Sequence, residues 1–150
     1  MSNVQPCIVG TKAPRFDLQA TTPELRQERI RSKTFQGRWL AILFYPRDFS
    51  FVCPTELIGF SAEKPQFDQR RCDLLGISID SVESHAKWMK TPASEGGVEG
   101  LRISLASDPD GDLCKGFGVW RDDDGLPNRG LFLIDPDGIL RYAASYDLSV

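Results

Sequence analysis

Several features that mark common protein classes are scarce or absent in this sequence. The 150 residues include one histidine, His85, and four cysteines, none of which belongs to a C-x-x-C pair. A single histidine makes a zinc site unexpected, because zinc sites are usually built from several histidine and cysteine ligands. The missing C-x-x-C pair argues against a dithiol disulfide reductase, which needs two thiols close together in the sequence.

Long apolar runs and an excess of one charge are also absent. No apolar run approaches the ~20 residues that a membrane-spanning helix needs, and the N-terminus has no basic head or long apolar core typical of a secretory signal. With 18 basic and 21 acidic residues, the net charge of −3 argues against binding to nucleic acid or to an anionic membrane. We therefore expect a cytoplasmic protein whose residues 1–150 form one domain, since no repeat or linker divides the chain.

Apolar segments that suit strands alternate along the chain with segments that suit helices. The expected strands cover residues 13–18, 39–45, 72–79, 101–106, 131–134 and 139–145. The expected helices cover 53–70, where Pro65 should kink or end the helix, 82–90 and 112–117. This alternation, followed by a closing hairpin, predicts an α/β fold: a three-layer sandwich with a mixed central β-sheet.

The segment Phe44–Leu57, FYPRDFSFVCPTEL, places Cys53 between an apolar strand and a helix that Pro54 can begin. A free cysteine is only roughly 3 % ionised at pH 7, and a helix N-terminus lowers its pKa by about one unit, so a reactive thiolate needs a nearby cation as well. Ser50 can donate a hydrogen bond to the sulfur or to an oxygen beside it, and the ring of Pro46 can shield the sulfur from water.

Each of these residues also has an ordinary structural interpretation. Cys53 can be a small buried apolar residue, Ser50 a helix cap or turn residue, and Pro46 the end of a strand. Arg129, immediately before the apolar run 131–134, can be a solvated loop charge or can point its guanidinium at the sulfur. His85 fits a packing or helix-surface position, as most histidines do.

The other cysteines offer no comparable signal. Cys72 opens an expected strand and Cys114 lies in a short expected helix, so both suit packing roles, whereas Cys7 lies in a tail expected to be flexible. Phe49, four residues before Cys53, suits either a core position or an interface between copies of the chain.

The pattern Pro46-x-x-x-Ser50-x-x-Cys53 resembles the active-site signature of the peroxiredoxins, and the wider segment resembles their two-cysteine subgroup. The likeness runs from about Val9 to the C-terminus and includes the blocks LGISIDS at 75–81, SHAKW at 84–88 and RGLFLID at 129–135. The resemblance implies a thioredoxin-like fold and a thiol-dependent peroxidase that acts on hydrogen peroxide and small organic hydroperoxides.

The resemblance also implies a role for each residue of the site. Cys53 would be the peroxidatic cysteine, which becomes a sulfenic acid, Ser50 would hydrogen-bond the peroxide, and Pro46 would shield the thiolate. Arg129 would be the active-site cation, and Glu56 would orient an active-site arginine. No metal or organic cofactor is implied.

The implied partners are a peroxide substrate, an external thiol reductant such as a thioredoxin-like protein, and further copies of the chain in a homodimer or a ring of dimers. In the two-cysteine subgroup the resolving cysteine lies in a C-terminal segment of the partner subunit. The sequence ends at Val150, before such a segment, so we expect a single peroxiredoxin domain without its C-terminal helix and resolving-cysteine tail. Alternatives are a one-cysteine peroxidase, a peroxide-responsive sensor or holdase with little turnover, and a disulfide reductase.

Overall fold

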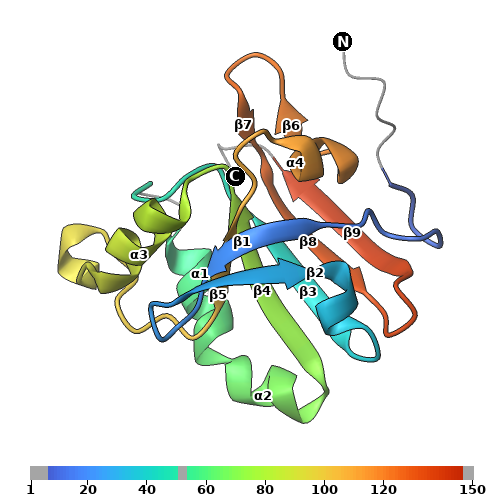
Figure 1. The fold of residues 1–150 in the computed structure, drawn as a ribbon, viewed down its shortest axis with the longest axis horizontal. Coiled ribbons are helices and arrows are strands. Elements are labelled where there is room, and N and C mark those ends of the chain that lie inside the picture. The colour runs from blue at the N-terminus through green and yellow to red at the C-terminus, as the bar shows by residue number, and fades with distance from the viewer. Residues whose placement is uncertain (1–6, 51–53, 147–150) are drawn as a thin grey trace.

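The computed structural model describes residues 7–50 and 54–146. Within them, seven strands form one mixed sheet in the order β2-β1-β5-β4-β3-β8-β9, and β6 and β7 form a separate ribbon (Figure 1). The strands are β1 (Asp17–Thr21), β2 (Gln27–Arg31), β3 (Trp39–Phe44), β4 (Cys72–Ser78), β5 (Ser104–Ser107), β6 (Trp120–Arg121), β7 (Leu126–Pro127), β8 (Arg129–Ile134) and β9 (Leu140–Tyr146). The pairs β3–β4 and β4–β5 are parallel, and the other pairs are antiparallel.

Helices cover both faces of the sheet. They are α1 (Pro54–Ala62), α2 (Lys64–Gln69), α3 (Val82–Lys90) and α4 (Asp112–Gly116), with 3-10 turns η1 (Ser32–Phe35) and η2 (Ala93–Glu95). Leu57 of α1 and Trp88 of α3 belong to the core on one face, whereas Leu113 of α4 belongs to the core on the other. The predicted three-layer α/β sandwich with a mixed sheet is therefore confirmed.

Strand β3 lies between two cores, which explains why its sequence is apolar without interruption. Ile42 and Phe44 pack in the core with α4, and the alternate residues Ala41 and Leu43 pack in the core with α1 and α3. Successive side chains of a strand point to opposite faces, so a strand covered on both faces needs apolar residues at every position. This rigid central strand ends where the chain begins its approach to Cys53.

The helix predicted over 53–70 is broken in two, and the break confirms the expected effect of Pro65. Helix α1 ends at Ala62, Glu63 precedes α2, and Pro65 lies in the first turn of α2. Proline is tolerated there because the first-turn N–H has no acceptor within the helix. Cys53 itself lies outside the described residues.

Two strand predictions were wrong in position, and three strands were missed: β2 and the two short strands β6 and β7. The stretch predicted at 13–18 becomes β1 only from Asp17, because Ala13 N–H donates to Gly138 O of the closing hairpin turn instead of to a strand neighbour. The strand predicted at 101–106 is β5, Ser104–Ser107. Strand β2 was missed because its sequence, QERIR, is polar at four of five positions, as an edge strand permits.

The helix at 82–90 and the closing hairpin agree with the predictions. Ser81 caps α3 by accepting a hydrogen bond from Ser84 N, and β8 and β9 pair around the turn at Asp135–Gly138. Because β8 also pairs with β3, the start of β8 lies beside the end of β3, where Gly130 pairs with Phe44.

Candidate active site

The register of β3, β8 and β9 brings Arg129 to the loop that leads to Cys53. Phe44, the last residue of β3, pairs with Gly130, so Arg129 lies one residue beyond the end of that pairing. Arg129 in turn pairs with Tyr146 on β9. The loop therefore starts beside Arg129 and Tyr146, at the same end of strands β3, β8 and β9.

Arg129 is buried, so the alternative of a solvated loop charge is wrong. Arg129 is 7 % exposed, and its Nη1 lies 3.6 Å from Glu56 Oε2. Its Cζ lies 5.2 Å from the centre of the Tyr146 ring, a cation–π distance. No acceptor among the described residues receives a hydrogen bond from Arg129 Nε. A buried guanidinium normally has all its donors paired, so this N–H is available to a further acceptor.

Glu56 and Tyr146 form the other half of this arrangement. Glu56 lies in the first turn of α1, where the helix dipole favours a carboxylate, and its Oε1 accepts a hydrogen bond of 2.5 Å from the Tyr146 hydroxyl. Burial, together with the hydrogen bond to Glu56, raises the pKa of Tyr146 to about 12. Tyr146 is therefore a neutral donor over the whole physiological pH range.

The structure thus brings together two residues predicted for the site, Arg129 and Glu56, and adds Tyr146, which sequence reasoning missed. Tyr146 ends a strand of ordinary alternation, and its position opposite Arg129 follows only from the β8–β9 register. Nothing in the local sequence marks it.

Pro46 and Ser50 lie in the loop between β3 and α1. Pro46 is buried and Ser50 is half-buried. Because Cys53 lies outside the described residues, contacts of Pro46 and Ser50 with its sulfur stay predictions.

Phe49, between these two residues, has a strained backbone. Its φ of 61° lies in the left-handed region, which costs a non-glycine residue about 1–2 kcal/mol. The ring packs against Trp88 at a centroid distance of 6.2 Å, yet 41 % of the residue stays exposed. Phe49 is therefore neither a full core residue nor a free one, and neighbouring contacts must hold the loop in this conformation.

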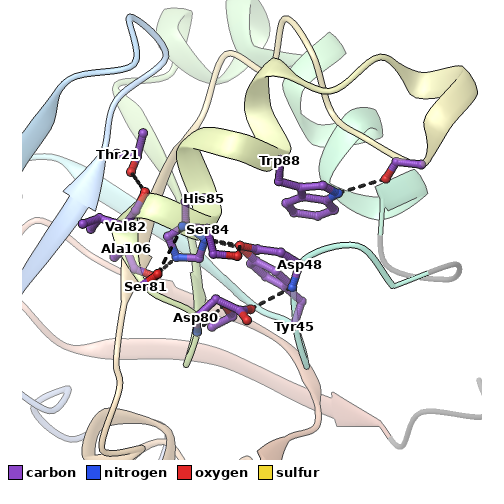
Figure 2. Close-up of polar contacts among 12 residues, drawn as sticks. Thr21, Tyr45, Asp48, Asp80, Ser81, Val82, Ser84, His85, Trp88 and Ala106 are labelled. Atoms are coloured by element: carbon purple, nitrogen blue, oxygen red, sulfur yellow. Dashed lines mark hydrogen bonds and ion pairs between the residues drawn. The ribbon is translucent and has the colours of Figure 1, made fainter.

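A buried polar network beneath the loop provides such contacts (Figure 2). Asp48, 5 % exposed, accepts hydrogen bonds from the Tyr45 and Ser84 hydroxyls, each at 2.8 Å, and lies 2.8 Å from His85 Nδ1. Its backbone N–H donates to Asp80 Oδ2 at 2.7 Å. His85 is fully buried, so its predicted packing position is confirmed and the surface alternative is wrong. The network itself was not predicted.

The three described cysteines are poor candidates for a reactive thiolate. Burial raises the pKa of the Cys7, Cys72 and Cys114 thiols, and the nearby Asp108 raises that of Cys114 further. Cys72 and Cys114 belong to the two cores, as predicted. The prediction of a flexible tail at Cys7 was wrong, because Cys7 packs against the core and its N–H donates to Gly116 O.

A mixed sheet with helices on both faces defines a thioredoxin-like α/β protein, and the end of β3, from which the described loop begins, lies beside the buried Arg129. The chain belongs to the AhpC/TSA family, whose model matches residues 9–143. The suspected peroxiredoxin resemblance is thereby confirmed.

Curated proteins and solved structures with peroxiredoxin names are similar to this chain over most of its length. A putative peroxiredoxin in the rubredoxin operon of Clostridium pasteurianum is 38 % identical over 144 residues, which cover 95 % of this chain and 81 % of that protein. Peroxiredoxin-2 of Mus musculus is 40 % identical over 142 residues, which cover 95 % and 71 %. The reduced 2-Cys peroxiredoxin of Plasmodium vivax superposes with a TM-score of 0.93 at 34 % identity, over 97 % of this chain and 75 % of that one.

These similarities make the chain a thiol-dependent peroxidase, as the Cys53 segment predicts. Within residues 7–50 and 54–146, no helix has the length and apolar character that a membrane crossing requires. The same part of the chain holds no group of three or more histidine, cysteine or acidic side chains placed to bind a metal ion.

Proposed function

We propose that Cys53 is the peroxidatic cysteine and that its substrates are hydrogen peroxide and small organic hydroperoxides. The thiolate attacks the terminal peroxide oxygen, and the O–O bond breaks as a new S–O bond forms. The leaving oxygen takes a proton and departs as water or an alcohol. Cys53 is oxidised to a sulfenic acid and the peroxide is reduced, with no metal or organic cofactor.

The proposal is carried by the buried guanidinium of Arg129, the first residue of β8, beside the end of β3; no described residue accepts a hydrogen bond from its Nε–H. A donor fixed in a water-poor site stabilises charge that develops on a reacting oxygen far more than a donor in water does. We propose that Arg129 and Ser50 donate to the peroxide oxygens. Pro46, already buried, would keep water from the sulfur, and Glu56 would hold the guanidinium in place.

The state of the other cysteines supports the same choice. The nucleophile in this reaction is a thiolate, and burial disfavours the thiolate at Cys7, Cys72 and Cys114. The same argument disfavours all three as the thiol that attacks the sulfenic acid. We therefore propose that a thiol outside this set, from an external thioredoxin-like reductant or from a further protein segment, forms the disulfide and releases water.

We also propose that copies of the chain associate as a homodimer or a ring of dimers. Phe49, whose own backbone is strained, is partly exposed, and this exposed part of its ring is a suitable contact for a second copy. Plasmodium yoelii Prx1a modified at its N-terminus forms an artifactual octamer. Sedimentation velocity of the wild-type protein and of Phe49→Ser should show a loss of the associated species in the variant. A cytoplasmic location stays a prediction of the sequence.

Intact-mass measurement after one equivalent of hydrogen peroxide tests the assignment of Cys53. The wild-type protein should gain one oxygen or form a disulfide within seconds, and Cys53→Ser should not. Cys7→Ser and Cys72→Ala serve as matched controls and should react as the wild type does. Full steady-state peroxide consumption by Cys53→Ser would overturn the proposal, and single oxidation without turnover in the presence of a thiol donor would favour the sensor or holdase alternative.

A further inference from the structure

The two nitrogens of the His85 ring both lie beside hydrogen-bond acceptors. Nδ1 lies 2.8 Å from Asp48 Oδ2, and Nε2 lies 3.0 Å from the backbone oxygen of Ala106. A carbonyl oxygen can only accept, so Nε2 must carry a hydrogen. A neutral imidazole has one N–H, which would leave the lone pair of Nδ1 facing the Asp48 carboxyl group (Figure 2).

The surroundings of Asp48 indicate that it is the ionised partner. Its Oδ1 accepts from the Tyr45 hydroxyl, and its Oδ2 accepts from the Ser84 hydroxyl as well as facing the ring. A carboxylate with two oxygens takes all these donors, whereas in a protonated carboxyl group Oδ2 would become an O–H donor to Nδ1 and a weaker acceptor for the Ser84 hydroxyl. The Tyr45 hydroxyl lies 3.5 Å from His85 Nδ1 but gives its one hydrogen to Asp48 Oδ1 at 2.8 Å. Asp80, which also faces the pair, accepts from the Asp48 N–H and from the Ser78 hydroxyl.

A buried carboxylate without a counter-charge is strongly disfavoured, and a protonated His85 ring would supply that charge. The side chains of His85 and Asp48 are 0 % and 1 % exposed, so water cannot replace either partner. Breaking a buried ion pair by removing one member leaves the other charge uncompensated, which is far more costly than the pair is favourable.

We propose that His85 is a positioning residue of the peroxidase site and that it is a doubly protonated imidazolium. Its Nδ1–H holds Asp48 and, through it, the segment Pro46–Ser50, while its Nε2–H donates to Ala106 O. Asp48 directly precedes Phe49, whose left-handed backbone needs support, and Ser50 follows. Helix α3 and strand β5 thus hold the loop through one ring, by way of Asp48 and Ala106. The proposal rests on the proposed role of this loop beside Cys53.

The protonation state can be measured without any reaction. His85 is the one histidine in the sequence, so a ¹⁵N spectrum of labelled imidazole rings has no overlap. We expect N–H signals from both ring nitrogens at pH 7 in the reduced wild-type protein. A spectrum with one N–H and one unprotonated nitrogen would overturn the proposal.

The positioning role is tested with two variants that keep different halves of the ring's hydrogen bonding. The short amide of His85→Asn can place its NH₂ group near the position of Nδ1 and donate to Asp48, whereas the longer amide of His85→Gln reaches the position of Nε2 and Ala106 O. We expect His85→Gln to slow the reaction of Cys53 with hydrogen peroxide by about tenfold, as expected for losing a hydrogen bond to a buried charge. His85→Asn should recover most of that loss.

Thr21→Val is the matched control for general weakening of α3. The Thr21 hydroxyl on β1 donates to Val82 O of α3 at 2.7 Å (Figure 2). This hydrogen bond is buried and holds the same helix as His85 does, but it joins that helix to β1 and not to the loop. Thr21→Val should lower the melting temperature and leave the peroxide rate unchanged. Equal rates in His85→Asn and His85→Gln, or an equal loss in Thr21→Val, would overturn the positioning role. If Cys53→Ser were fully active, the proposed function would fail while the two N–H signals would remain, so the two failures are distinguishable.

Discussion

Tyr146 provides a direct test of how the side chain of Arg129 is held. Tyr146→Phe removes the hydroxyl that donates to Glu56 Oε1 at 2.5 Å and keeps the ring that lies 5.2 Å from Arg129 Cζ. A hydrogen bond to a charged group contributes about 1.5–3 kcal/mol, and the partial exposure of the Glu56 side chain, 23 %, places this one at the lower end. About 1.5 kcal/mol corresponds to a roughly tenfold slower reaction with peroxide, if the whole contribution is realised in the transition state.

The physical reason is a competition for the guanidinium. At 3.6 Å, Glu56 is within ion-pair distance of Arg129 Nη1 but beyond a good hydrogen bond. The phenol holds one carboxylate oxygen. Without the phenol, Glu56 can turn and occupy the Arg129 N–H groups that we propose as donors to the peroxide. Tyr146→Leu removes the aromatic face as well. Arg129 is buried but Tyr146 is only half-buried, so the lost cation–π contact should add about 1 kcal/mol, or a further fivefold.

Stopped-flow fluorescence of the tryptophans during oxidation by hydrogen peroxide measures the second-order rate constant. Tyr142→Phe, a change on the same strand at a residue that is 48 % exposed, is the matched control and should leave that constant unchanged. Wild-type reactivity of Tyr146→Phe would refute the claim that the phenol holds Glu56 away from Arg129. Identical rates for the phenylalanine and leucine variants would show that the aromatic face contributes nothing.

Three further predictions follow from the described contacts. In a spectrophotometric titration, the difference between wild type and Tyr146→Phe should have a midpoint of about 12, and a midpoint near 10 would contradict the buried donor. Burial, and then the charge of Asp48, raise the pKa of Asp80, so the wild type loses stability as the pH rises through that pKa. Because Asp80→Asn does not titrate, its free energy of unfolding relative to the wild type, measured with guanidinium, should increase between pH 4 and pH 7. A decrease over that range would contradict the raised pKa. Gly97→Ala should lower the melting temperature far more than Gly100→Ala, because a Cβ at Gly97 would collide with the backbone of Thr91. Gly100, at φ +84°, has open space around it, so an alanine there meets only the left-handed strain of about 1 kcal/mol. Equal losses in the two variants would refute this explanation.

The parts of the fold that were predicted are those whose signal is local. A run such as LAILF in β3 or a turn such as Asp135–Gly138 determines its own structure, and Pro65 interrupts a helix whatever surrounds it. The parts that were missed depend on neighbours. Strand β2 is polar because it lies at the sheet edge, and the start of β1 depends on which segment accepts the hydrogen bonds of the residues before it.

The candidate site divides in the same way. The Pro46, Ser50 and Cys53 pattern and the positions of Glu56 and Arg129 can be predicted from the sequence through its resemblance to the family. Their assignment to chemistry stays a proposal, and the 3.6 Å approach of Glu56 to Arg129 comes from the β3–β8 register. Tyr146 and the partners of Asp48 could not be predicted, because each is defined by a side chain opposite it in space rather than by its own sequence neighbours.

The loop between β3 and α1 is anchored on both sides of its strained residue. Before Phe49, the carboxylate and N–H of Asp48 are fixed by Tyr45, Ser84, His85 and Asp80; after it, Glu56 of α1 is fixed by Tyr146. A residue in the left-handed region persists only where its surroundings over-determine it. Anchors on both flanks satisfy that condition, and they come from different elements, α3 on one side and β9 on the other. The described part of the loop can therefore keep the left-handed conformation of Phe49.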